Sequence, residues 1–201
     1  MRIKSARQCW HDCYMNSRQL EGFEPKVQKT VRDAGSVATE VAAHQVMAGH
    51  IQRAISKLPP PLQMLGHWLY APDGVFPDSN ENAIWQMVAL LSDITDPECD
   101  EWYLARCALH CYKQNVWGRD SELNKARAIG EWLYEQHGVD INSRRFSVKY
   151  GIAWDRIRGV IDDLDKRALM PVARVVWLMT EDMSEASSFD WDGHEAVLNK
   201  A

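Results

Sequence analysis

Apolar residues recur every three or four positions over most of the chain, the spacing of a helix that buries one face. This spacing runs between successive breaks at proline or glycine, and no convincing alternation of apolar and polar residues occurs before residue 138. The pattern therefore predicts a mainly helical protein. The expected helices cover residues 5–20, 36–57, 61–71, 83–94, 98–116 and 121–138.

Residue types that favour helix ends mark several of these boundaries. Ser5, Ser36 and Ser121 stand where an N-cap side chain would accept a hydrogen bond from a first-turn amide. The prolines at 59–61 stop one helix and suit the first turn of the next, because proline lacks the amide hydrogen that a helix interior needs. Gly138 suits a left-handed C-cap. We therefore expect separate helices joined by short connections.

Residues 143–162 match the template of a helix-turn-helix, which is two short helices joined by a tight turn. Ser147 supplies the small residue of the first helix, and Gly151 supplies the turn residue, which must tolerate a positive φ. The five apolar positions of the template are held by Phe146, Tyr150, Ile152, Ile157 and Val160. The expected fold is all-α with a C-terminal helix-turn-helix, although any helical hairpin with a glycine turn can imitate this template.

Positive charge is concentrated in this segment, although the formal net charge of the chain is −5. Residues 143–158 hold five basic residues and a single acidic residue, Asp155. Arginines on the second helix can reach guanine edges, whereas basic residues before it are placed to neutralise phosphates. Trp154 could meet thymine methyls or sugars, or pack half-buried within the protein. The candidate DNA-binding residues are Arg144, Arg145, Lys149, Trp154, Arg156 and Arg158.

The same features divide the chain into three parts. Residues 1–117 form a helical body, and residues 118–171 contain the helix-turn-helix. Residues 172–201 hold two basic and six acidic residues, and we expect a wing or helix followed by an acidic tail. The apolar fraction of 46% and charged fraction of 25% are those of a globular protein, so we expect a packed core.

No catalytic motif emerges from the sequence. It contains no phosphate-binding glycine loop and no nucleophile elbow, and the nearest carboxylate group, Asp162, Asp163 and Asp165, is expected at the exposed end of the second helix. We therefore expect no enzymatic activity, no cofactor and no small-molecule substrate.

The cysteines give a weak metal signal. Cys9 and Cys13 are four residues apart, as are Cys107 and Cys111, so two helices could offer four thiolates to zinc. Buried small hydrophobic positions produce the same spacing, and we favour that interpretation. The odd number of five cysteines, with no signal-peptide pattern and no apolar run of bilayer length, predicts a cytoplasmic protein with no membrane partner. The expected DNA binding adds association with the nucleoid.

Three segments resemble the Q-type transcription antitermination proteins of phages and pseudomonad prophage-like regions, in their AlpA-like branch. They are SARQCWHDCY at residues 5–14, LPPPLQMLGHWLYAP at residues 58–72, and WGRD at residues 117–120, which leads into the helix-turn-helix. The resemblance spans most of the chain. Some Q-type proteins carry zinc-finger spacing, which this sequence lacks, so a role for metal is not transferred.

The resemblance implies a function as well as partners. Such proteins bind a short double-stranded DNA element at a promoter, engage the bacterial RNA polymerase holoenzyme and travel with it past terminators. The helical body and acidic tail would supply the polymerase contacts. Two alternatives remain open at this point: a conventional repressor or activator that stays at the promoter, and an interaction protein whose helical hairpin binds protein.

Overall fold

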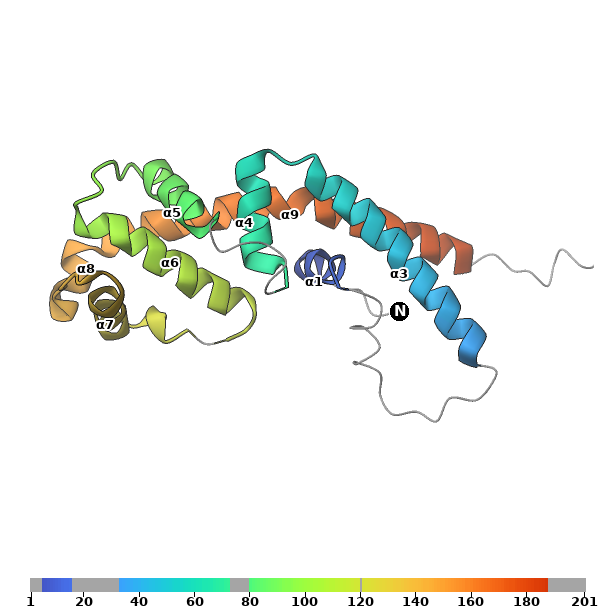
Figure 1. Ribbon diagram of the computed structural model, residues 1–201, viewed down its shortest axis with the longest axis horizontal. Coiled ribbons are helices and arrows are strands. Elements are labelled where there is room, and N and C mark those ends of the chain that lie inside the picture. The colour runs from blue at the N-terminus through green and yellow to red at the C-terminus, as the bar shows by residue number, and fades with distance from the viewer. Residues whose placement is uncertain (1–4, 16–32, 73–79, 120, 188–201) are drawn as a thin grey trace, which may run out of the picture. The chain divides into compact units, whose positions relative to one another are not determined.

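The fold is helical throughout the part of the chain that the computed structural model describes. That part comprises residues 5–15, 33–72, 80–119 and 121–187. It contains no strand, which confirms the predicted all-α class (Figure 1). The α-helices are α1 (Ala6–Asp12), α3 (Asp33–Ser56), α4 (Pro60–Tyr70), α5 (Asn80–Leu91), α6 (Asp100–Val116), α7 (Ala126–His137), α8 (Phe146–Lys149) and α9 (Gly151–Ser187). Two short 3-10 helices are η1 (Glu122–Asn124) and η2 (Ser143–Arg145). None of the described helices is both long and apolar enough to cross a bilayer.

Several predicted helix ends are confirmed. Ser5 accepts a hydrogen bond from the amide of Gln8 and caps α1. Pro59 is the N-cap of α4, and Pro60 occupies its first turn. Gly138 ends α7 with a φ of 69°, in the left-handed conformation that glycine adopts without strain. Local residue chemistry therefore determines these boundaries.

Other ends differ from the prediction. α3 begins at Asp33, so Ser36 lies inside the helix and is not its N-cap. Ser121 caps the short η1, by accepting from the amide of Leu123, and not the α-helix that follows. α5 ends at Leu91, because the chain turns at Asp93, whose φ of 58° is incompatible with a continuing right-handed helix. The first predicted helix, 5–20, ends at Asp12, and residues 16–20 lie outside the described part.

The chain forms two compact units, which do not coincide with the predicted division after residues 117 and 171. One unit comprises residues 58–168, and the other joins residues 1–57 to residues 169–201. The long helix α9 contributes to both, since its residues 151–168 belong to the first unit and its later residues to the second.

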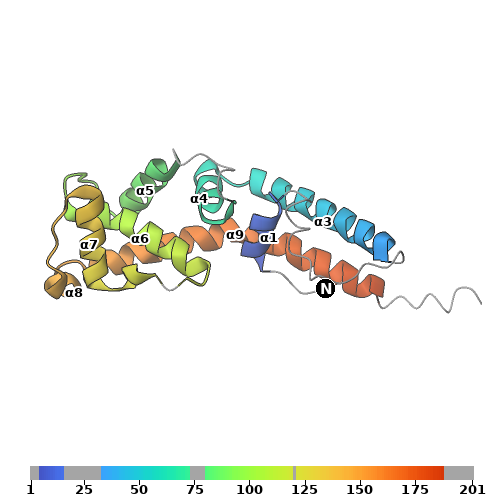
Figure 2. The same cartoon turned by 60° about the horizontal axis from the view of Figure 1, so that its bottom comes forward.

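The unit of residues 58–168 is built around α6. Leu104, Ala108 and Leu109 on this helix are at most 1% exposed, and α6 packs against α5 and α7. Figures 1 and 2 both show α5 and α6 beside the first half of α9. This arrangement places the N-terminal end of α9, with α8 and η2, next to the loop between α5 and α6.

In the other unit, α1 packs on α3. Trp10 is fully buried, and Ile51 and Ile55 on α3 are at most 2% exposed. The side chain of Gln52 donates to the carbonyl oxygen of Cys13 at 2.6 Å, which fixes the end of α1. The short α1 is thus held by burial and by a tertiary hydrogen bond.

Residues 172–187 continue α9, which settles the choice between a wing and a helix for this stretch. Its buried positions, Ala168, Val172 and Val176, repeat at a spacing of four residues. Pro171 is tolerated inside the helix although it removes one backbone donor. Residues 188–201, the rest of the predicted acidic tail, lie outside the described part.

Candidate nucleic-acid interface

The backbone of residues 143–162 differs from the predicted helix-turn-helix. α8 has four residues and is followed by Tyr150 alone, after which α9 begins at Gly151. The amide of Tyr150 donates to Phe146 at 2.8 Å, and the amide of Trp154 donates to Tyr150 at 2.8 Å, so α8 ends and α9 begins at this one residue. Gly151 is helical, and the positive φ predicted for it is wrong. The structure does not confirm a helix-turn-helix.

The buried side chains of this segment follow one helical stripe. Phe146, Tyr150 and Ile157 are buried as predicted, and Val160 is half-buried. Ile152 was expected in the core, but it is 78% exposed. The physical reason is that positions two residues apart on an α-helix face nearly opposite sides, so the burial of Trp154 on α9 turns Ile152 to solvent.

Trp154 takes the buried position instead. It is 7% exposed, and its ring meets Phe146 edge-on, with the ring centroids 5.8 Å apart. The expectation that Trp154 faces solvent is therefore wrong. Trp154 instead packs within the protein, which was the alternative interpretation.

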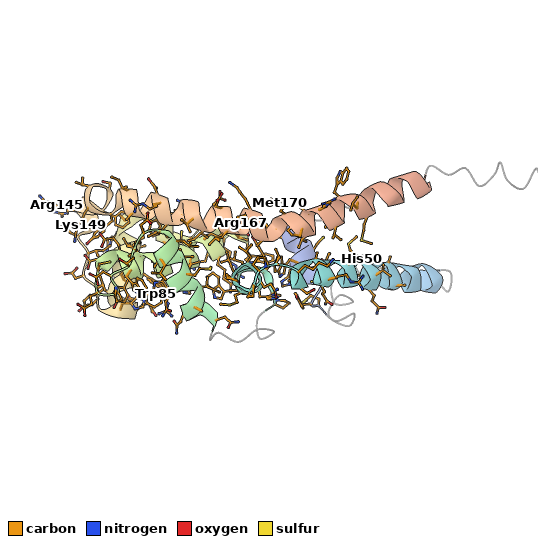
Figure 3. All side chains as sticks on the ribbon, turned by 90° about the horizontal axis from the view of Figure 1, so that it is seen from above. His50, Trp85, Arg145, Lys149, Arg167 and Met170 are labelled. Atoms are coloured by element: carbon orange, nitrogen blue, oxygen red, sulfur yellow. The ribbon has the colours of Figure 1, made fainter. Side chains whose placement is uncertain are left out.

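The basic side chains are exposed, as predicted. Arg144, Arg145 and Arg158 are exposed, and their guanidinium groups make no ion pair or hydrogen bond to any residue in the described ranges. Figure 3 shows Arg145 and Lys149 together at α8. Three arginines thus present their full hydrogen-bonding capacity to solvent.

Lys149 is committed to a contact within the protein. Its ammonium group lies 3.0 Å from the carboxylate of Asp100, the first residue of α6, and also donates to the hydroxyl of Tyr150. Tyr150 in turn donates to Asp100. The hydrogen bond to Tyr150 and then the one to Asp100 raise the pKa of Lys149, and the bond from Tyr150 lowers the pKa of Asp100. This triad ties the junction of α8 and α9 to α6.

Arg156 is partly engaged as well. Its guanidinium donates to the carbonyl oxygen of Ser92 at 3.2 Å and lies 3.8 Å from the carboxylate of Asp93. Its side chain is still 49% exposed, so part of its fork remains accessible. Asp93 and Asp100 belong to a stretch, residues 93–101, that holds five acidic residues. The acidic stretch is visible in the sequence, but its position beside residues 149–156 is a tertiary feature.

Asp165 was expected at an exposed end of the helix, but it is buried. It is 1% exposed and accepts hydrogen bonds from the hydroxyls of Tyr70 at 2.5 Å and Tyr112 at 2.8 Å. Asp163 is exposed, and Asp162 pairs with Lys166 at 2.6 Å. Asp162 also accepts from the Tyr112 hydroxyl, at 3.4 Å, so Asp162 and Asp165 share a partner while Asp163 lies apart from them. Asp165 joins α4 and α6 to α9, a role that two tyrosines far away in the sequence could not reveal.

The four paired cysteines are buried free thiols. Burial, together with the nearby Cys9, raises the pKa of Cys13 to about 12, so this thiol is protonated at neutral pH. Among the residues that the structure describes, no group of three or more histidine, cysteine or acidic side chains is arranged to hold a metal ion. Two of these thiols donate hydrogen bonds: the Cys13 Sγ to the carbonyl oxygen of Trp10 at 3.0 Å, and the Cys111 Sγ to the side-chain oxygen of Asn124 at 3.3 Å.

Comparison of the sequence with models of protein families and with curated proteins gave no match, and comparison of the structure with solved structures gave none. The candidate interface consequently rests on its own geometry: three exposed arginines, one half-exposed arginine and a lysine held by α6.

Proposed function

We propose that this chain is a sequence-specific DNA-binding antitermination factor, which binds a promoter-proximal element and loads onto RNA polymerase to promote read-through of pauses and terminators. The observation that carries the DNA-binding part is the exposure of Arg144, Arg145 and Arg158 without partners in the described ranges. The antitermination part rests on the resemblance of residues 5–14, 58–72 and 117–120 to Q-type proteins.

The cations fall into two groups with different expected roles. Arg144 and Arg145 flank α8 and supply phosphate contacts, whose free energy comes from release of condensed counterions. Arg158, together with the free part of Arg156, is on α9, and an α-helix fits the major groove, where an arginine fork matches the O6 and N7 atoms of guanine. Lys149 holds α8 against α6 and contributes to DNA binding through its position more than through its charge.

Salt-dependent DNA binding tests the first part. The Arg144→Ala, Arg145→Ala double variant should bind a random-sequence 40-base-pair duplex more weakly, and the slope of log affinity against log salt should fall by about 2. Fluorescence anisotropy at several salt concentrations measures both quantities. The matched control, Lys125→Ala with Arg127→Ala, removes the same charge from exposed positions at α7 and should retain the parental slope.

Loss of a base contact should weaken binding in a sequence-dependent way, unlike loss of a phosphate contact. Arg158→Ala should cost about 1–3 kcal/mol on duplexes selected for binding by the parent protein and much less on random duplexes. If the arginine variants and the control bind DNA equally, or if the parent binds no DNA at low salt, DNA binding through this face is refuted.

Genome-wide occupancy of the tagged protein beside RNA polymerase tests the second part. An antitermination factor should appear at a promoter and extend with polymerase through downstream terminators, and purified protein should increase read-through of a terminator in transcription in vitro. A sharp peak that stays at the promoter, with no read-through, would identify a conventional repressor or activator.

A further inference from the structure

Two large aliphatic side chains lie among the cations of this interface and are exposed to water. Val148 on α8 is 86% exposed and Ile152 on α9 is 78% exposed, the two highest values among the exposed large hydrophobic residues of the described ranges. Burying such a side chain is favourable by about 1.5–3 kcal/mol, so a folded chain gains nothing from leaving both of them in solvent. Their exposure points to a partner that covers them.

The two residues lie close together along the chain, at the end of α8 and the start of α9. Val148 lies in α8 and Ile152 lies in the first turn of α9, four residues apart and on either side of Tyr150, at which α8 ends. Gly159 follows Ile152 by seven residues and belongs to the same face. A methyl group added at Gly159 would meet nothing within 4 Å, so packing within the protein does not require glycine there. A helical glycine on an open face lets another molecule approach the backbone closely.

The charge around this face selects the partner. Arg144 and Arg145 precede Val148, and the half-exposed Arg156 follows Ile152 by one turn. Arg156 already faces Asp93 at 3.8 Å, but a wholly apolar protein surface would leave Arg144 and Arg145 without counter-charges, whereas duplex DNA supplies phosphates at the edges of a groove and apolar groups inside it. The apolar group that the major groove presents is the C5-methyl of thymine.

We infer that Val148 and Ile152 read thymine methyl groups in the major groove, and that the DNA element recognised by this protein contains thymines at the positions facing α8 and the start of α9. This inference rests on the proposed DNA-binding function and adds the base that the interface prefers. The arginines then provide phosphate and guanine contacts. The aliphatic pair distinguishes thymine from the other bases, which charge alone cannot do.

Replacing thymine by uracil tests the inference, because uracil differs only in lacking the methyl group. Duplexes selected for binding by the parent protein are prepared with either deoxythymidine or deoxyuridine. Each contacted methyl group is worth about one buried CH₂, so the parent should bind the uracil duplex about fourfold more weakly per contacted position. The Val148→Ala, Ile152→Ala double variant should bind both duplexes equally and keep the parental salt slope.

Met170→Ala serves as the matched control, since Met170 is also a large apolar residue, 66% exposed, on α9. It should show the full parental preference for thymine. Circular dichroism and thermal unfolding verify that each variant is folded, and neither substitution removes a buried side chain.

Three results would overturn the inference. Equal affinity of the parent for thymine and uracil duplexes, with a steep salt dependence retained, refutes methyl reading and leaves the proposed function standing. Loss of RNA polymerase binding by the double variant, with its thymine preference unchanged, would identify the aliphatic pair as a protein contact. Failure of the parent to bind any duplex at low salt refutes the inference together with the proposed function.

Discussion

Side chains of the same chemical class differ in this protein in their partners and in their pKa, according to their surroundings. Lys149 and Arg158 are both basic, exposed and in the same segment, yet Lys149 is bound to Asp100 and Tyr150 while Arg158 has no partner in the described ranges. The same holds for histidine. Burial on α4 lowers the pKa of His67 from 6.5 to about 4, because the charged imidazolium is poorly solvated there.

The lowered pKa of His67 predicts a pH dependence of stability. Below pH 6.5 the unfolded chain binds a proton at this residue, and the folded chain does not until the pH approaches 4. Stability is therefore complete above pH 6.5 and is lost as the pH falls from 6.5 toward 4. The His67→Gln variant lacks this titration, so the free energy of unfolding of the parent should fall relative to that of the variant over this range.

Urea denaturation at closely spaced pH values, for both proteins, measures the difference. A parallel pH dependence of parent and variant would show that His67 titrates alike in the folded and unfolded chains.

At the scale of elements, the predicted helix-turn-helix and the observed structure differ most at the junction of α8 and α9. A helix-turn-helix needs a positive φ at Gly151, whereas the structure has Gly151 as the first residue of a 37-residue helix. A methyl group added at Gly151 would meet nothing within 4 Å. The substitution Gly151→Ala thus separates the two conformations by its effect on stability.

In a helical conformation, Gly151→Ala should stabilise the protein by about 0.5–1 kcal/mol, because alanine loses less backbone entropy on folding. Gly138→Ala is the control with the opposite sign, since Gly138 has a φ of 69° and alanine there should cost about 1–2 kcal/mol. Thermal and urea unfolding measure both variants. Destabilisation by Gly151→Ala as large as that by Gly138→Ala would favour a turn at residue 151.

At the scale of the whole molecule, each compact unit has its own buried side chains. Leu109 lies in the core around α6, and Ile55 lies under α1 in the other unit. Both are at most 2% exposed, so truncation of either to alanine leaves a cavity.

Leu109→Ala should destabilise the unit of residues 58–168 by about 2–5 kcal/mol and reduce amide-exchange protection there more than in residues 42–57. Ile55→Ala should show the reverse distribution. Hydrogen exchange followed by mass spectrometry resolves the two regions. Equal loss of protection in both units by either variant would mean that they unfold as one cooperative body.

Local patterns in the sequence determined the class of the fold and most of its elements. The helical spacing of apolar residues, the N-cap at Ser5, the prolines at 59–61 and the glycine at 138 act over a few residues, so they can be interpreted without knowing the rest of the chain. The exposure of the basic residues in 143–158 followed from the same local reasoning.

Tertiary structure decided which residues of the candidate site are accessible. Trp154 and Ile152 are both apolar and two positions apart on α9, and only the side on which α9 packs determines that the first is buried and the second exposed. The contacts of Lys149 with Asp100 and of Asp165 with two tyrosines join positions 49 to 95 residues apart. Short-range periodicity contains no information on such pairs, because they depend on how whole helices pack.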